Sequence, residues 1–342
     1  MQPRSFRVGR PAGVSLASPK CVRSSEPSTK LFAVNIVNDA NAGYGEILSV
    51  PLPARRVSSQ ELYMHTSARL IPYVTITILS LALSVTGQIA PAAIPIPEHV
   101  ILVMEENHGY SQIIASSKAP YINTLASVGA LFTNSYAITH PSQPNYLELF
   151  SGSNQGVTDD SCPHTFSVPS LESELIAATK TFRGYSEGLP AVGATVCTSG
   201  LYARKHVPWT DFSKDLTSDN LPFTSFPTNY SKLPTVAWVI PNLDDDMHNG
   251  TIQQGDTWLQ GHLLGYVNWA MKNNSLLIVT FDEDQGTTTN HIATIFVGPM
   301  VKPGKYSEKI NHYNVLRTIE DMYGLSHLGN SSNATPITDV WQ

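Results

Sequence analysis

Cysteine, charge and long apolar runs are all scarce in this sequence. Only 3 of the 342 residues are Cys and 14% are charged. No repeat with a period of about 20–50 residues is visible, which argues against a solenoid or a propeller. Hydrophobic residues make up 42% of the chain, a share typical of globular proteins and not of disordered ones. The length leaves room for one large α/β domain or two smaller ones.

Basic residues are rare in the part of the chain after position 90. Residues 91–342 hold 12 Lys and Arg against 23 Asp and Glu, a net charge of −11, whereas residues 1–63 hold eight basic and four acidic residues. An acidic surface repels nucleic-acid phosphates, which disfavours nucleic acid as a partner. Any chemistry on a phosphate would need a local cation.

The longest apolar run, about 15 residues after Arg69, is short for a membrane span and contains Pro72. It follows Met64 and one positive charge and ends in small residues near Ala90, a pattern typical of a secretory signal peptide. We therefore interpret 1–63 as the extension of an overlong gene model, 64–90 as a signal peptide and 91–342 as the mature domain, without a membrane span. The alternative is that the Arg- and Ser-rich prefix is a genuine organelle transit peptide.

Cysteine usage fits export from the cell. After the prefix only Cys162 and Cys197 remain, an even pair that could close one disulfide in an oxidising compartment. The mature region also has five sequons for N-glycosylation, which begin at Asn229, Asn249, Asn273, Asn330 and Asn333. Together these features predict a secreted glycoprotein, extracellular or in the cell wall.

Continuous apolar runs predict four buried parallel strands, at residues 99–104, 235–240, 276–281 and 292–297. Helical patterns occur at 170–178, 257–271 and 312–324, and another helix starts at Ser142 and stops at Gly152. Strands alternating with helices predict an α/β sandwich with a mostly parallel central sheet. In such sheets ligands bind at the carboxyl ends of the strands.

Acidic clusters follow three of the four predicted strands, at residues 105–109, 241–248 and 282–286. Carboxylates that converge on one edge of a buried sheet repel one another unless a cation lies between them. Oxygen ligands suit a hard divalent ion such as Ca²⁺, Mg²⁺ or Mn²⁺, with Zn²⁺ or Fe less favoured. For any single cluster, the alternative is a solvated acidic loop.

Ser142 stands at the start of its predicted helix. Its simplest role is that of a helix N-cap. Alternatively, a hydroxyl at this place meets the positive end of the helix dipole and free backbone N–H groups, which favour a phosphate attached to it. Asn145, three residues further on, could donate its side-chain N–H to a phosphoryl oxygen. The residues alone leave both roles open.

Several motifs follow one another in a specific order: Val103-Met-Glu-Glu-Asn107, His140-Pro-Ser-Gln-Pro-Asn-Tyr146 with Phe150-Ser-Gly152, Arg204-Lys-His206, Phe281-Asp-Glu-Asp284 with Phe296-Val-Gly-Pro299, and 311–321. From about His99 to the C-terminus the chain thereby resembles the phosphoesterase family of acid phosphatases and phospholipases C, within the alkaline-phosphatase-like superfamily. The resemblance implies that superfamily's three-layer α/β sandwich, and a hydrolase that acts on phosphoric ester bonds.

The resemblance also implies roles for individual residues. Ser142 is the nucleophile that becomes transiently phosphorylated, and Asn145 is a ligand of the phosphoryl oxygen. One divalent metal ion is held by Glu106, Asn107, Asp282, Glu283 and the Ser142 alkoxide. Lys205, His206, His248 and His291 line the phosphate pocket, where a His or Lys protonates the leaving oxygen. Glu105 and Asp284 are alternative ligands if the register is shifted by one, and Asp246 is either a ligand of a second cation or a loop acid.

The leading hypothesis is a secreted, metal-dependent phosphatase that acts on small phosphate monoesters. Ser142 favours it, because phospholipase C relatives often carry Thr at this place. The first alternative is a phosphodiesterase or phospholipase C that acts on phospholipid head groups. The second is an inactive, metal-binding secreted glycoprotein, against which the intact set of motif residues speaks. We find no full set of His and Asp ligands for a second metal, which favours a one-metal site.

The segmentation of the N-terminus is directly testable. If residues 64–90 are removed during export, Edman sequencing of the secreted protein will start near positions 88–91. A start at Met1 would refute this segmentation.

Overall fold

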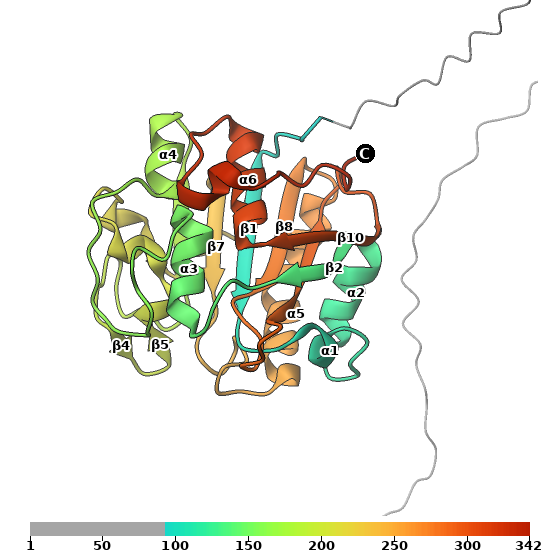
Figure 1. Cartoon of the computed structure of the whole chain (residues 1–342), viewed down its shortest axis with the longest axis horizontal. Helices are drawn as coiled ribbons and strands as arrows, with labels where there is room; N and C mark the ends of the chain where they lie inside the picture. Colours follow the sequence, from blue (N-terminus) through green and yellow to red (C-terminus); the bar gives the residue numbers. More distant parts are fainter. Residues whose placement is uncertain (1–92) are drawn as a thin grey trace, which may run out of the picture. The chain divides into compact units, whose positions relative to one another are not determined.

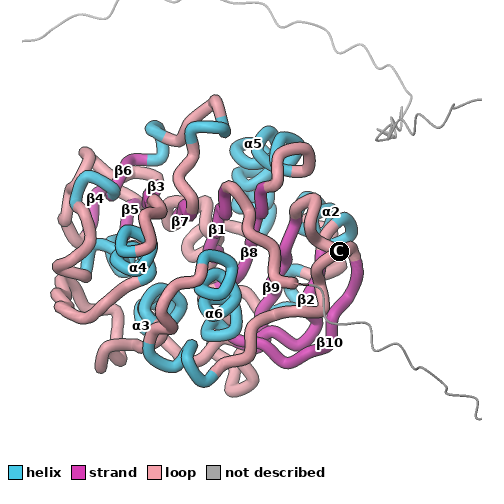
Figure 2. The backbone as a smooth tube through the Cα atoms, turned by 90° about the horizontal axis from the view of Figure 1, so that it is seen from above, coloured by secondary structure: helices cyan, strands magenta, loops and turns pink. Residues whose placement is uncertain are grey.

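The computed structural model describes residues 93–342. The predicted prefix (1–63) and signal peptide (64–90) lie outside the described residues and stay predictions. Residues 93–342 form an eight-stranded sheet with helices on both faces (Figures 1 and 2). None of the helices in this range has the length and hydropathy that a transmembrane span requires.

The strands are β1 (His99–Glu105), β2 (Ala130–Tyr136), β3 (Phe182–Ser186), β4 (Thr198–Ser199), β5 (Tyr202–Ala203), β6 (Asn220–Pro222), β7 (Val236–Ile240), β8 (Ser275–Phe281), β9 (His291–Val297) and β10 (Gly304–Asn311). The α-helices are α1 (Tyr110–Ile113), α2 (Pro120–Val128), α3 (Ser142–Ser151), α4 (Leu171–Ala177), α5 (Ile252–Ala270) and α6 (His312–Tyr323). Among the short 3₁₀ helices, η1 (Arg204–His206) contributes to the site described below.

The large sheet is mostly parallel, as predicted. Its order is β10-β2-β9-β8-β1-β7-β3-β6, and β4 and β5 form a separate hairpin. The prediction was wrong for residues 292–297, because β9 is antiparallel to both of its neighbours, β8 and β2. An apolar run shows that a strand is buried, but it does not encode the direction of the strand.

The sheet has a hydrophobic core on each face. In β1, Val100, Leu102 and Met104 belong to the core shared with α3, α4 and α6, while Ile101 and Val103 belong to the core shared with α2 and α5. Figure 2 shows these two helix layers on opposite sides of the strands. A strand covered on both faces needs apolar residues at every position, which explains the uninterrupted runs in the sequence. The predicted three-layer α/β sandwich is therefore confirmed.

Local sequence explains where the helices begin and end. Gly152 and Gly324 adopt positive φ angles of 71° and 63° as C-caps of α3 and α6, a conformation that glycine adopts without a steric penalty. The helix predicted at 257–271 begins earlier, at Ile252, where the Thr251 hydroxyl accepts a hydrogen bond from Gln254 N (3.2 Å). Strands β2, β3 and β10 were not predicted because they mix polar with apolar residues.

The predicted disulfide is present. Cys162 lies in the loop after α3 and is bonded to Cys197, with an S–S distance of 2.12 Å. Arg204 N donates to Cys197 O (2.9 Å), so the disulfide connects this loop to the segment that leads into η1. Two segments distant in the sequence are thereby held beside the carboxyl edge of the sheet.

The buried face of α3 is expected to be a major source of stability. Leu149, on α3, is fully buried, and Leu149→Ala should lower the free energy of unfolding by about 2–5 kcal/mol, because a cavity remains in the core. Leu264→Ala on α5 is the matched control, since Leu264 is 40% exposed and should cost well under half as much. Urea denaturation with the disulfide intact measures both, and equal losses would contradict this account of the core.

Candidate active site

The site lies where three parallel neighbours, β8, β1 and β7, end at one edge of the sheet. Glu106 directly follows β1, Asp282 directly follows β8, and Asp246 lies in the loop after β7. Two backbone hydrogen bonds join these ends, from Asp282 N to Glu105 O (3.0 Å) and from Glu106 N to Asp246 O (2.8 Å). The sheet therefore brings the acidic clusters together, as its topology requires.

Ser142, the first residue of α3, brings its side chain to these acids. Its hydroxyl Oγ lies 3.1 Å from Glu106 Oε2 and 3.2 Å from Glu283 Oε1, and the side chain is buried. Pro141 occupies the N-cap position, so the structure does not support the simple reading of Ser142 as an N-cap.

Asn107 completes the group through a bend in the backbone. Its φ of 41° turns the chain away from β1, and its Oδ1 lies 3.4 Å from Ser142 Oγ. Its backbone N–H donates to Asp282 Oδ1 (3.1 Å). Glu106, Asn107, Asp282 and Glu283, the four predicted ligands, thus surround Ser142. The alternatives Glu105 and Asp284 make no hydrogen bond to Ser142 in the described part of the chain.

The electrostatics of this group call for a cation. Burial and the neighbouring Asp246 raise the pKa of Glu106 well above its ordinary value, and burial with Glu106 and Glu283 does the same to the pKa of Asp282. Burial also raises the pKa of Glu283. Asp282 Oδ2 is buried and has no hydrogen-bond partner among residues 93–342. An oxygen-rich donor set with such an orphaned atom fits a hard divalent ion.

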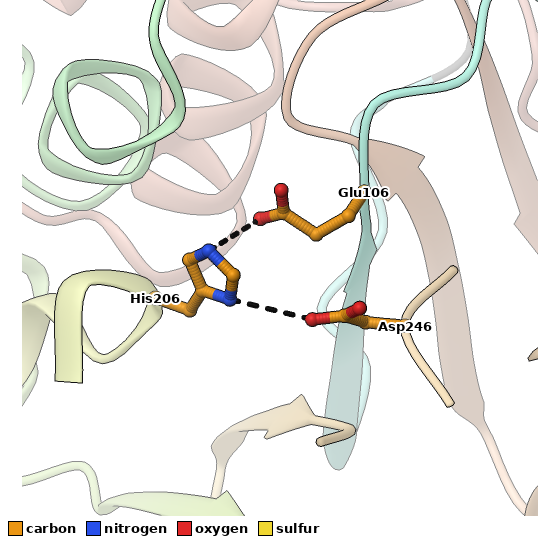
Figure 3. A group of neighbouring side chains, drawn as sticks. All are labelled: Glu106, His206 and Asp246. Atoms are coloured by element: carbon orange, nitrogen blue, oxygen red, sulfur yellow. Dashed lines mark ion pairs between the residues drawn. The ribbon is translucent and has the colours of Figure 1, made fainter. Parts of the chain in front are cut away.

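Glu106 also belongs to a second group, together with His206 and Asp246 (Figure 3). The Nε2 of His206 lies 3.0 Å from Glu106 Oε1, and its Nδ1 lies 3.3 Å from Asp246 Oδ2. Within residues 93–342, these three side chains are the one His/Asp/Glu group whose ligand atoms all lie within 4.8 Å of one another. Asp246 is therefore a buried member of the site. The sequence had left open whether it is a ligand of a second cation or only an acid in a loop.

His206 is held as a neutral ring. Burial, with the nearby Lys205 and His248, lowers its pKa well below the ordinary value, so its contacts with Glu106 and Asp246 are not pairs of full charges. Its Nε2 is close to Glu106 but lacks hydrogen-bond geometry, and the ring stacks on Tyr146 at 5.0 Å between centroids. Tyr146 in turn donates its hydroxyl to Glu106 Oε1. The two rings thereby fix the orientation of Glu106.

Lys205 and His248 form the outer rim of the site. Lys205 Nζ lies 3.5 Å from His248 Nε2, and His248 is exposed to solvent. Burial opposes the charge of Lys205, but the hydrogen bond to Asp160 and the charges of Glu106 and Asp282 outweigh it and raise its pKa. The rim therefore places one permanent cation and one solvent-accessible imidazole beside the buried carboxylates.

Asn145, which was predicted to bind a phosphoryl oxygen, is bonded to the backbone instead. The Oδ1 of Asn145 accepts from the backbone N–H groups of Ile138 and Thr139, and its Nδ2 donates to the carbonyls of Thr139 and Pro141. All four bonds hold the loop before α3, which leaves the amide no free N–H for a phosphoryl oxygen.

His291 stacks between Tyr110 and Tyr136, with ring centroids 4.6 and 5.1 Å away, and its Nε2 bonds with Thr133 O. None of these contacts involves the Ser142 group. The geometry therefore gives no support to the prediction that His291 lines the phosphate pocket.

The sequence reasoning missed His140 and Tyr146. The Nδ1 of His140 is hydrogen-bonded to Glu283 Oε2, and its Nε2 lies 3.0 Å from Thr287 O. Burial lowers the pKa of His140, but these contacts outweigh it and raise the pKa. Both residues stand inside the motif around Ser142, and Tyr146 lies one helical turn after it, which is the spacing of side chains on one helix face. That spacing could have indicated that Tyr146 lies beside Ser142.

The geometry of the site agrees with the family to which the sequence is similar. The profile of the Phosphoesterase family matches residues 112–326, so the chain belongs to this family. Its predicted class, a hydrolase that acts on phosphoric ester bonds, is thereby confirmed.

Individual relatives carry phosphatase names. A phosphatidylinositol-3-phosphatase of Mycobacterium tuberculosis is 53% identical over 256 residues, which cover 74% of this chain and 86% of the relative. An acid phosphatase of Aspergillus fumigatus is 30% identical over 248 residues, which cover 66% of this chain and 54% of the relative. Among solved structures, the lipoteichoic acid synthase LtaP of Listeria monocytogenes has a similar fold, with a TM-score of 0.51 at 9% identity and coverage of 67% and 72%.

A cation among the carboxylates should stabilise the folded state. Adding Mg²⁺, Ca²⁺, Mn²⁺ or Zn²⁺ at about a hundred times its dissociation constant to the chelated protein should raise the melting temperature by roughly 5–10 °C for the ion that binds. Asp282→Asn removes one charge from the buried group and should abolish most of this increase. Asp159→Asn, an exposed loop acid, is the control and should leave it intact. Calorimetry that finds no effect of any of the ions would contradict the proposed cation.

Proposed function

We propose that this protein is a secreted, metal-dependent phosphatase that hydrolyses phosphate monoesters through a phosphoserine intermediate on Ser142. The single observation that carries the proposal is the Ser142 hydroxyl at the first turn of α3, within 3.4 Å of Glu106, Asn107 and Glu283. A serine used only as a helix cap would have no reason to face buried acids.

Glu106, Asn107, Asp282, Glu283 and Ser142 are the residues that would hold one divalent metal ion. Such an ion lowers the pKa of a coordinated hydroxyl and neutralises charge on phosphoryl oxygens. His140 and Tyr146 then act as positioning residues, because each holds one of the carboxylates by a hydrogen bond. His206 and Asp246 pack behind Glu106 and exclude water from it.

The reaction needs two displacements at phosphorus. In the first, Ser142 Oγ passes its proton to Glu283 Oε1, 3.2 Å away, and attacks; the P–O bond to the alcohol breaks, and His248 at the rim gives a proton to the leaving oxygen. In the second, His248 takes a proton from the attacking water, the P–Oγ bond breaks, inorganic phosphate leaves, and Glu283 returns the proton to Ser142 Oγ. Lys205 and the N–H groups of the first turn of α3 bind the phosphoryl oxygens throughout. Asn145 supports this turn through its four bonds to the preceding loop.

The leaving group has a polar place to bind. A cavity of about 500 Å³ opens beside Ser142 and is lined by Asn107, His140, Pro141, Glu283, Asp284, Gln285 and Gly286. Amide and carboxylate groups suit the hydroxyls of a polyol or sugar. We therefore propose small phosphorylated polyols, including the phosphoinositol head group in the name of the mycobacterial relative, as substrates.

Two observations support secretion. The Cys162–Cys197 disulfide suits an oxidising compartment. Four of the five sequon asparagines, Asn229, Asn249, Asn330 and Asn333, are exposed, as glycosylation requires. Asn273 is partly buried and donates its side-chain N–H to Trp269 O (2.7 Å), so we expect no glycan there.

Replacing the nucleophile tests the mechanism. Ser142→Ala in the full chain should reduce hydrolysis of p-nitrophenyl phosphate by roughly 10³-fold or more, since no phosphoserine can form. Ser127→Ala on the exposed side of α2 should keep wild-type activity. Rapid-quench labelling with ³²P substrate should trap a phosphorylated wild-type chain and no phosphorylated variant.

Other outcomes would decide against the proposal. Unchanged activity of Ser142→Ala would refute the mechanism. Faster hydrolysis of phosphatidylcholine or a bis-ester than of any monoester would establish the alternative, a phosphodiesterase or phospholipase C. If the folded wild-type chain hydrolyses no ester with any divalent metal, the result would favour the second alternative, an inactive metal-binding glycoprotein.

A further inference from the structure

The first turn of α3 has few free N–H groups. The backbone N–H groups at the start of a helix have no partner within it, and here they belong to positions 141–144. Pro141 and Pro144 have no N–H. Ser142 and Gln143 therefore provide the two backbone donors next to the nucleophile.

One of these two donors is occupied by a carboxylate of the chain itself. Asp160 Oδ1 accepts the N–H of Gln143 (3.0 Å), while its Oδ2 accepts from Lys205 Nζ (2.7 Å). A helix N-terminus and a lysine are the kinds of donors that bind a phosphate. Asp160 thus bridges the two groups that the proposed function assigns to the phosphoryl oxygens.

Asp160 belongs to the electrostatic environment of the nucleophile. Lys205, whose Nζ lies 2.7 Å from Asp160 Oδ2, is also attracted to Glu106 and Asp282, two of the acids around Ser142. A further negative charge beside these carboxylates is repelled by them, which weakens its hold on the donors. Asp160 is also one-third exposed, so its side chain has open space into which it can move.

The disulfide keeps Asp160 near its partners. Asp160 lies two residues before Cys162, and Cys162 is bonded to Cys197, whose carbonyl accepts the N–H of Arg204 next to Lys205. Between this anchor and α3, residues 158–161 are exposed. The loop therefore keeps the carboxylate within reach of these donors.

We propose that Asp160 is a displaceable, built-in competitor of the substrate: its carboxylate occupies the Gln143 N–H and Lys205 in the free enzyme and leaves them when a phosphoryl group binds. This inference rests on the proposed function for its ligand, a phosphoryl dianion. The dianion replaces a single charge by two and also contacts Ser142, which the loop carboxylate does not. Asp160 thereby restricts the site to ligands that bind more tightly than a tethered carboxylate, and it disfavours monoanions such as sulfate esters and carboxylates.

Equilibrium binding of inorganic phosphate tests the proposal without any need for turnover. A group that holds the donors about nine-tenths of the time weakens a ligand about tenfold. Calorimetric titration of the full chain should therefore show about tenfold tighter phosphate binding for Asp160→Ala. Asp160→Asn keeps the shape and loses the charge, and should show a smaller gain.

The controls separate competition from a structural role. Asp159→Asn removes an equal charge from the same loop, where Asp159 bonds only with Ser161, and should leave phosphate affinity unchanged. In the Lys205→Ala background, the gain from Asp160→Ala should shrink to a few-fold, because the donor that it releases is absent. Thermal unfolding of each variant verifies folding, and Asp160→Asn remains available if Asp160→Ala does not fold.

A positioning role for Asp160 predicts the opposite sign. If Asp160 serves only to orient Lys205 or the loop, both variants will bind phosphate more weakly, and this result, or an unchanged affinity, overturns the proposal. Turnover of p-nitrophenyl phosphate by the wild-type chain is scored separately. Its absence counts against the proposed function, whereas turnover with no gain in phosphate affinity counts against this inference alone.

Discussion

The mutual repulsion of Glu106, Asp282 and Glu283 is the constraint on which the rest of the site depends. Buried carboxylates cannot all stay ionised unless something positive or hydrogen-donating compensates them. Each has such a partner in the chain: Tyr146 for Glu106, the Asn107 N–H for Asp282 and His140 for Glu283. His140, whose pKa is raised by these contacts, and Lys205 at the rim offset part of the negative charge, and the proposed cation would offset the rest.

The same requirement explains why the charged residues sit where three strands end. The parallel order β8-β1-β7 directs three chain segments to one edge, where the polar residues that follow the strands meet. His206, neutral and stacked on Tyr146, separates Glu106 from Asp246 without adding charge. Residues 91–342 carry a net charge of −11, which disfavours binding of polyanions in general. Lys205 at the rim is the positive charge that can attract a small anion to this one place.

Much of this was visible in the sequence because it depends on local patterns. Apolar runs located β1, β7 and β8; residues that follow β1 and β8 surround Ser142, and Asp246, in the loop after β7, lies beside His206. The direction of β9 and the contacts of Asn145 and His291 depend on partners far away in the chain, which periodicity does not encode. Asp160 stands in a polar loop like many others, and only the fold shows that it reaches the N-terminus of α3.

The antiparallel direction of β9 has a consequence for how this enzyme can diversify. A parallel strand after β8 would require a crossover to the opposite edge of the sheet, whereas β9 lets the chain turn back at once. Residues 282–290 therefore remain as a hairpin loop over the site, and part of it walls the cavity beside Ser142. Its exposed tip, residues 285–289, is the part of the loop where substitutions disturb the sheet least. A substitution at this turn therefore changes the wall of the cavity without changing Ser142 or the acids around it.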